Sequence, residues 1–506
     1  MKQKLVSLLL FLLVGWPVQG LPARQPEIIY QVFPRSFQDG GSDGTGDLDG
    51  VVKRLDYIKD LGADSIWLTP IHESPSYHGY DATDFYSIHR DFGTQSSMDQ
   101  LIDQADRRGL RVMLDLAVNH SSIKHGWFTK RRDLYLWSAV PLPWSKFPVD
   151  PGYRIEDYWH RFGREFFFAS FGGGNFADFD WRKTSVMSEI KAVFRHWIER
   201  GVGGFRLDAA KYLVKGPEGE LNTPETHRVW KELAREMHAL HSETYLLGEI
   251  WDSPEQISTY YGQGDELDGA FDFPTCHGLR DSLKSHSGRA FAQALRDRIR
   301  VQPTVRFATP FLGNHDMARI ASEVGGDIPR LKLAALAYLS LPGPVTIYYG
   351  DEIGLPNGSL LDHAGDRAKR TPMQWSMIPG MGFTQNSKPW LPFSKAQASL
   401  TVETQSRDPQ SLLNTYRNLL RLRQQSETLR DGEIVNVREP EPGVVTFVRK
   451  SGDGGEKDLL IVLNFSFRPA KLFRVLQSTK ARKLFGLSDE TEPTIKAHSG
   501  AIFELL

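Results

Sequence analysis

The stretch that decides the fold is Gly204-Phe205-Arg206-Leu207-Asp208, a short run that ends in charge. After an amphipathic stretch comes a second apolar run, Leu246-Leu247-Gly248-Glu249, which also ends in an acid. Short apolar runs that alternate with longer amphipathic stretches are typical of βα units. The two runs are therefore predicted to be parallel strands that carry Asp208 and Glu249 at their C-terminal ends.

Outward from these runs, the same alternation recurs along most of the chain. The candidate strands are Ile28–Phe33, Ser65–Pro70, Arg111–Ala117, Gly204–Asp208, Tyr245–Glu249, Leu267–Phe271, Arg306–Gly313 and Val345–Tyr349. Eight such units predict the α/β class and a (β/α)₈ TIM barrel. Chemistry in such barrels lies at the C-terminal strand ends, so polar residues there are candidate site residues.

The repeat is interrupted twice. Between the third and fourth predicted strands lies far more chain than one helix and two loops need. After the amphipathic segment Leu412–Gln424, alternating runs such as Asp458–Phe465 replace the βα rhythm. We predict the barrel over residues 21–118 and 182–425, an inserted small domain over 119–181, and a C-terminal antiparallel β domain over 426–506.

Composition narrows the class of protein. The chain has 506 residues, 24% of them charged, and a net charge of −1. Nucleic acids and acidic membranes usually select a basic face, which this balance does not favour. Sugars bind well on flat aromatic faces, and the chain has 12 Trp. We expect a neutral substrate and no nucleic-acid partner; the oligomeric state is left open.

The N-terminus resembles a secretion signal. Lys2 and Lys4 precede an apolar run, residues 5–16, and small residues near Gly20 suit cleavage. The run is too short for a stable membrane anchor. Residues 1–20 are predicted to be a signal peptide, and the mature protein to be secreted or periplasmic without an anchor. Cys276 is the only cysteine, so no internal disulfide is possible.

The acids at the strand ends suit glycosidic bond cleavage. With retention, one carboxylate attacks the anomeric carbon and a protonated carboxyl donates to the leaving oxygen. Arg206 shares a strand face with Asp208 and would keep it ionised. Glu249 has apolar neighbours that would raise its pKa. Asp316 follows the seventh strand, and no HExxH or similarly compact spacing indicates a zinc or iron centre.

Four segments carry a resemblance to a known family. They are Asp115-Leu116-Ala117-Val118-Asn119-His120, Gly204-Phe205-Arg206-Leu207-Asp208, Gly248-Glu249-Ile250-Trp251 and Phe311-Leu312-Gly313-Asn314-His315-Asp316. In this order they resemble the shared motifs of the α-amylase family, glycoside hydrolase family thirteen. The resemblance spans roughly residues 27 to 425. It implies a retaining glycoside hydrolase that works through a covalent glycosyl-enzyme intermediate and needs no organic cofactor.

The resemblance also implies a role for each site residue. Asp208 would be the nucleophile, Glu249 the general acid/base, and Asp316 would bind sugar hydroxyls and favour the distorted ring. Five further residues would contact the substrate or orient the nucleophile: Tyr80, His120, Arg206, Lys211 and His315. Tyr80 would stack on the sugar ring and Arg206 would orient Asp208.

The substrate is less determined than the chemistry. Ala209 goes with α-1,4 linkages in related enzymes, and the absence of an acid at Tyr77 favours an open cleft of the amylase type. Arg370-Thr371-Pro372-Met373-Gln374-Trp375 instead resembles oligosaccharide-cleaving α-glucosidases and trehalose-forming isomerases. An α-amylase acting on α-1,4-glucans or maltooligosaccharides is favoured. The alternatives are an α-glucosidase, a transglycosylating relative and a non-catalytic carbohydrate-binding relative.

Calcium is the one metal that the sequence suggests. In many related amylases, an Asn at the position of Asn119 and a His at that of Tyr212 bind calcium between barrel and insert; the Tyr puts that site in doubt. Separately, the glycine-rich loop 39–47 spaces oxygen side chains as hard cations prefer. Its candidate ligands are Asp39, Asp43, Thr45 and Asp47. A structural Ca²⁺ in this loop is therefore an expectation.

Overall fold

The computed structural model describes residues 27–301, 307–360, 365–395, 397–452, 455–471, 476, 480–487 and 494–506. The predicted signal peptide lies outside the described residues. Among the helices that are described, none is long and apolar enough to cross a membrane.

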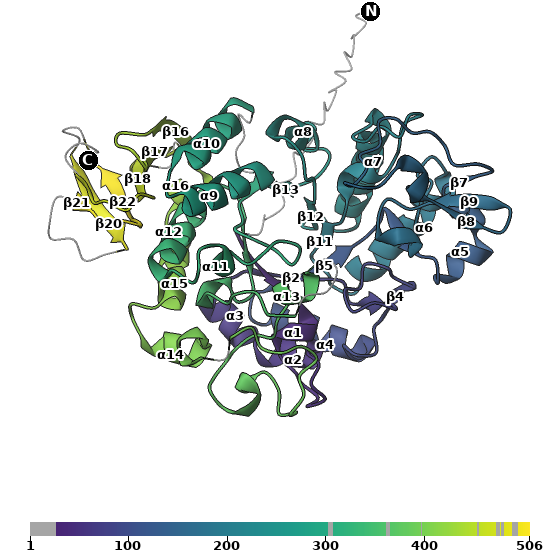
Figure 1. Cartoon of the computed structure of the whole chain (residues 1–506), viewed down its shortest axis with the longest axis horizontal. Helices are drawn as coiled ribbons and strands as arrows, with labels where there is room; N and C mark the ends of the chain where they lie inside the picture. Colours follow the sequence, from purple (N-terminus) through teal and green to yellow (C-terminus); the bar gives the residue numbers. More distant parts are fainter. Residues whose placement is uncertain are drawn as a thin grey trace, which may run out of the picture.

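Eight parallel strands form the centre of the molecule (Figure 1). They pair in the order β14-β13-β12-β11-β5-β2-β1-β15. An isolated parallel bridge between Phe311 and Thr346 joins the two ends of this sheet and closes the barrel. The strands are β1 (Ile28–Val32), β2 (Ser65–Leu68), β5 (Arg111–Leu116), β11 (Gly204–Leu207), β12 (Tyr245–Gly248), β13 (Gly269–Phe271), β14 (Ala308–Thr309) and β15 (Val345–Tyr348). The predicted TIM barrel is confirmed.

The seventh strand is shorter than the predicted Arg306–Gly313. Only Ala308 and Thr309 form β14. Pro310 follows them, and a proline has no N–H with which to continue a strand ladder. The segment that leads to Asp316 is therefore a loop that starts earlier than expected, which lets His315 and Asp316 turn into the barrel mouth.

Helices surround the barrel and begin at capping residues. Thr94 caps α4 with a reciprocal bond to Ser97, and Thr223 caps α7 with Pro224 in the first turn. The main helices are α2 (Leu48–Lys53), α3 (Leu55–Leu61), α4 (Gln95–Asp106), α6 (Thr184–Ile198), α7 (Pro224–Leu240), α8 (Pro254–Thr259), α9 (Phe273–Ser285), α10 (Arg289–Val301), α12 (Ile328–Leu339) and α15 (Leu412–Gln425). Their apolar faces join the barrel in one large core.

Two smaller sheet regions lie on opposite sides of the barrel (Figure 1). Between β5 and α6 the chain forms β6 (His120–Ser122), β7 (Trp137–Ser138), β8 (Trp159–Phe162), β9 (Glu165–Phe168) and β10 (Phe176–Asp178). The C-terminal antiparallel sheet has the order β16-β17-β18-β22-β20. It contains β16 (Glu433–Arg438), β17 (Val444–Lys450), β18 (Leu459–Asn464), β20 (Ala481–Gly486) and β22 (Ser499–Leu505). The predicted domain boundaries remain predictions.

Candidate active site

A cavity of about 750 Å³ opens at the C-terminal ends of the barrel strands. This volume is typical of sites that take small molecules. Residues from the barrel and from the insert line it together: His78, Tyr80, His120, Phe171, Phe176, Asp208, Ala209, Lys211, Tyr212, Glu249, Trp251, Asp316, Asp366 and Arg370. The structure thus brings the three predicted acids into one cavity with Tyr80, His120 and Lys211.

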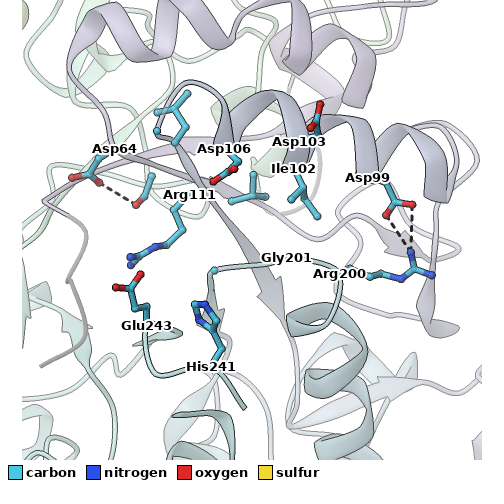
Figure 2. A pocket seen from close by; sticks show the side chains of 15 residues that line it. Asp64, Asp99, Ile102, Asp103, Asp106, Arg111, Arg200, Gly201, His241 and Glu243 are labelled. Atoms are coloured by element: carbon cyan, nitrogen blue, oxygen red, sulfur yellow. Dashed lines mark hydrogen bonds and ion pairs between the residues drawn. The ribbon is translucent and has the colours of Figure 1, made fainter. Parts of the chain in front are cut away.

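A second cavity, of about 660 Å³, lies at the opposite end of the barrel (Figure 2). Arg111 and Ser65, which begin β5 and β2, line it together with charged side chains such as Glu243. None of the predicted site residues reaches this cavity. Since barrel enzymes place their chemistry at the C-terminal strand ends, we take the first cavity as the candidate active site.

One buried guanidinium holds the centre of the site together. Nη1 of Arg206 donates to Asp208 Oδ1 at 2.6 Å and to Asp115 Oδ1 at 2.8 Å. Its Nη2 lies 2.7 Å from Glu249 Oε1, within ion-pair distance but outside hydrogen-bond geometry. Arg206 is fully buried, so this cation faces three carboxyl groups without solvent between them. The predicted contact between Arg206 and Asp208 is confirmed.

Burial raises the pKa of both Asp208 and Glu249, and Arg206 opposes the shift in each case. Apolar surroundings therefore do not separate the two acids as we expected from the sequence. Hydrogen bonding does, because of these two acids only Asp208 accepts a hydrogen bond from Arg206, which lowers the pKa of Asp208. This hydrogen bond favours the charged form of Asp208.

The backbone between these acids takes an unusual turn. Ala209 has φ +50°. This left-handed backbone conformation is energetically unfavourable for any residue other than glycine. In this conformation the Ala209 N–H donates to Glu249 Oε2 at 3.2 Å. Functional sites often hold such strain, and here the turn links the residue after Asp208 to Glu249.

Asp316 sits among hydrogen-bond donors. Arg370 Nη2 donates to its Oδ1 at 3.0 Å, and His315 Nε2 lies 3.0 Å from its Oδ2. Burial by itself would raise the pKa of Asp316, but these donors outweigh it and hold the pKa well below the usual range. Asp316 is therefore a fixed anion in the cavity.

The remaining predicted residues surround this centre. The Tyr80 hydroxyl donates to Asp115 Oδ2 at 3.0 Å, and its ring stacks on His315 with centroids 5.5 Å apart. Burial lowers the pKa of His120 to about 4, so this imidazole is neutral at ordinary pH. Stacking of Tyr80 on a sugar ring remains a prediction.

Lys211 and Trp251 form the side of the cavity next to Glu249. Lys211 Nζ donates to the Trp251 carbonyl at 2.7 Å and to Asp252 Oδ2 at 3.2 Å. The Trp251 ring is 43% exposed and stacks on buried Phe273 with centroids 4.4 Å apart. A supported aromatic face therefore lies open beside the acid that would protonate a leaving group.

A buried lysine joins the insert to the barrel. Lys215 Nζ donates to the Tyr212 carbonyl at 2.6 Å and to Asn119 Oδ1 at 3.2 Å, and it lies 2.8 Å from Asp178 Oδ2. Both ionic side chains are at most 1% exposed. The ammonium thus occupies an oxygen cage built from the two positions that the sequence linked to interdomain calcium, Asn119 and Tyr212. A metal ion has no place there while Lys215 fills it.

The loop 39–47 closes on its own backbone. Asp39 accepts hydrogen bonds from the N–H groups of Ser42 and Gly44, and Asp47 from those of Gly40, Gly41 and Gly50. Asp43 Oδ1 accepts from Thr45 N. Within the described ranges, no three His, Cys, Asp or Glu side chains converge as a metal site requires. Backbone N–H groups already bond to these carboxylates, so no step of the reaction is assigned to a cation, and calcium in this loop stays a prediction.

The contributors that were not singled out in the sequence include Gln31, Asp178 and Lys215. Gln31 Nε2 lies 2.7 Å from His315 Nδ1, across 284 residues of chain. The only local signal for Gln31 was its polar side chain in an otherwise apolar strand. Lys215 and Asp178 gave no signal, because neither belongs to a periodic apolar run.

Known proteins are similar over most of the chain. Residues 31–432 match the family model described as alpha amylase, catalytic domain. Alpha-amylase 3 of Dictyoglomus thermophilum is 31% identical over 83% of this chain and 81% of its own length. A trehalose synthase/amylase of Mycolicibacterium smegmatis is 32% identical over 89% of this chain and 85% of its own length. The crystal structure of an alpha-amylase from H. orenii has a TM-score of 0.80 at 30% identity and covers 95% of this chain and 99% of that one.

Proposed function

The chain belongs to the α-amylase family of glycoside hydrolases, and we propose that it cleaves α-1,4-linked glucans or maltooligosaccharides with retention, as an α-amylase does. Asp208 is the nucleophile, Glu249 the general acid/base, and Asp316 the anion that binds sugar hydroxyls. The observation that carries the proposal is the Asp208–Arg206–Glu249 arrangement, in which one guanidinium contacts both reacting carboxyl groups.

The closeness of the two carboxyl groups favours retention. Inverting enzymes keep their carboxyl groups about 6.5–9.5 Å apart so that a water molecule fits between sugar and base, whereas retaining enzymes keep them closer. Here the two ends of one guanidinium lie 2.6 Å from Asp208 Oδ1 and 2.7 Å from Glu249 Oε1, which keeps the two carboxyl groups close together. Asp208 attacks the anomeric carbon while Glu249 gives its proton to the leaving oxygen. Glu249 then takes a proton from water, whose oxygen bonds to the anomeric carbon and releases Asp208 as a carboxylate.

Two features favour a chain-like, neutral substrate. Position 77 holds an aromatic ring, not an acid, and Arg367 lies over this ring at 4.7 Å. On the other side of the cleavage point, Lys211 and the open face of Trp251 extend the cavity past Glu249. A cavity that continues past the cleavage point on the side of Lys211 and Trp251 suits cleavage within an oligosaccharide.

Product analysis on maltoheptaose, starch and maltose tests the proposal. We expect mixed short maltooligosaccharides from maltoheptaose and starch, with the α-anomer formed first. Glucose as the only product would favour an α-glucosidase, and trehalose from maltose would favour an isomerase. No reaction with any of the three would overturn the proposal in favour of a binding protein.

The alkaline limb of the pH profile should report the proton on Glu249. Burial raises the pKa of Glu249, so the protonated, active form persists above pH ~4.3, the ordinary value for Glu. Activity falls as pH rises through the raised pKa, because the deprotonated acid cannot protonate the leaving oxygen. The measurement is kcat/KM against pH for the wild type on maltoheptaose, and for Glu249→Gln on an aryl α-maltoside whose leaving group needs little protonation. Persistence of the alkaline limb in Glu249→Gln would refute this role.

A phosphorylated disaccharide should be a poor substrate. Asp208, Asp316 and Asp366 line the cavity, and of the cations there Arg370 is bound to Asp316 and Lys211 to Asp252. Because like charges in a site cost several kcal/mol, we expect kcat/KM for maltose 6′-phosphate to be at least ~10-fold below that for maltose. The difference in kcat/KM between maltose and maltose 6′-phosphate should become smaller at higher ionic strength, because salt screens the repulsion. Equal rates at low salt would contradict this prediction.

Secretion and calcium are further proposals, supported by sequence alone. The charged and apolar character of residues 1–20 supports export and signal cleavage, which N-terminal sequencing of the mature protein checks. Calcium in the loop 39–47 is tested by the melting temperature in chelator and in added calcium. A melting temperature that moves in neither case would remove the calcium hypothesis.

A further inference from the structure

Gln31 is a polar residue in the middle of a buried strand. It belongs to β1, is fully buried, and brings its side-chain amide to 2.7 Å from Nδ1 of His315. Within the part of the chain that the structure describes, its Oε1 has no hydrogen-bond partner. A buried carbonyl oxygen without a partner costs stability, so the amide group at this position calls for an explanation.

The hydrogen-bond network determines which nitrogen of His315 carries a proton. The Tyr80 hydroxyl gives its only proton to Asp115 Oδ2, so its oxygen can only accept from His315 Nε2, 2.5 Å away. Asp316 Oδ2, 3.0 Å from the same nitrogen, is an ionised carboxylate and also only accepts. His315 Nε2 must therefore carry the hydrogen.

The other nitrogen, Nδ1, must then accept. Burial lowers the pKa of His315, so the ring is neutral and carries a single hydrogen. A buried Nδ1 lone pair needs a donor, and the Gln31 amide supplies it. We propose that Gln31 is a positioning residue that holds His315 in the tautomer whose Nε2–H faces Asp316 and the sugar. The inference rests on the proposed function, since it assigns Gln31 to the same reaction.

Two substitutions at position 31 separate this role from simple packing. Gln31→Met removes the donor at similar volume, and we expect kcat/KM to fall about 10–100-fold, as when other partners that orient a histidine are lost. In Gln31→Glu, an ionised carboxylate at position 31 can only accept a hydrogen bond, so it favours a hydrogen on His315 Nδ1. His315 then keeps its Nε2–H only while the pair formed by this carboxylate and His315 holds one additional proton. The activity of Gln31→Glu relative to the wild type should therefore fall as pH rises. For Gln31→Met this relative activity should not change with pH.

Tyr30→Phe is the matched control. Tyr30 neighbours Gln31 in β1, is equally buried, and donates to Glu352 Oε1 at 2.7 Å, away from the site. The Tyr30→Phe variant loses one buried hydrogen bond, and its activity relative to the wild type should not change with pH. His315→Gln completes a double-mutant cycle: if Gln31 acts through His315, Gln31→Met should cost little in that background. Additive losses, or a Tyr30→Phe profile like that of Gln31→Glu, would overturn the inference.

The tautomer can also be read without turnover. Imidazole ¹⁵N shifts of histidine-labelled protein distinguish a protonated Nε2 from a protonated Nδ1, and His315→Gln identifies the resonance by its loss. We expect protonated Nε2 in the wild type and a mixture in Gln31→Met. Protonated Nδ1 in the wild type would overturn the inference about Gln31. A wild type that hydrolyses no α-glucan overturns the proposed function instead and leaves the tautomer result in place.

Discussion

Asp208→Asn should leave a folded protein whose hydrolysis of maltooligosaccharides is slower by at least roughly 10⁴-fold. An amide is no nucleophile toward the anomeric carbon, and it no longer carries the charge that Arg206 holds at 2.6 Å. The shape of the side chain is retained, so the loss should appear in kcat and not in folding. Initial rates on maltoheptaose and the circular dichroism spectrum measure the two effects.

A matched substitution tests whether the loss of any carboxylate would lower the hydrolysis rate as much as Asp208→Asn does. Asp268→Asn makes the same chemical change beside the N-terminal end of β12, where Asp268 accepts from Leu246 N at 2.8 Å. It should leave the rate on maltoheptaose near that of the wild type. Chemical rescue gives a second check, because azide added to Asp208→Gly with an activated substrate should form the β-glycosyl azide. More than a tenth of wild-type activity in Asp208→Asn would refute the assignment.

Lys215→Met should lower the free energy of unfolding by about 3–5 kcal/mol. The substitution leaves the Asp178 carboxylate buried without its cation, and it also removes the donor to Asn119 and to the Tyr212 carbonyl. Removal of one partner of a buried ion pair is costly because the other charge cannot reach water. Urea unfolding followed by tryptophan fluorescence measures the loss.

Two further variants identify the cause. Asp178→Asn combined with Lys215→Met removes both charges and should recover part of the lost stability, since no unpaired ion remains. Lys183→Met alters an exposed lysine just before α6 and should change the free energy of unfolding by less than ~0.5 kcal/mol. A loss below ~1 kcal/mol for Lys215→Met would mean that solvent reaches Asp178.

Much of the fold was accessible to prediction because strands of a parallel barrel have a local signature. Each is a short apolar run, and its last residue lies at the barrel mouth, so Asp208 and Glu249 could be placed from their own neighbours in the chain. The seventh strand was overextended to Gly313 because apolar character continues past Pro310, while the strand ends before it.

The candidate site was predicted less completely. Arg206 was expected to favour Asp208, yet its guanidinium also lies 2.7 Å from Glu249. Strand periodicity says on which side a residue points, but it does not say how many partners meet there. The pKa order of the two acids likewise depends on the direction of individual hydrogen bonds.

The sequence by itself determined the barrel, the family and the position of the three acids at the barrel mouth, because strand periodicity and contiguous motifs are properties of neighbouring residues. Only the tertiary structure decided that Lys215 fills the cage between insert and barrel, and that Gln31 meets His315 across 284 residues. Such pairs form where distant segments pack, and burial makes their partners obligatory, because a buried polar group away from water must find its hydrogen bond within the protein.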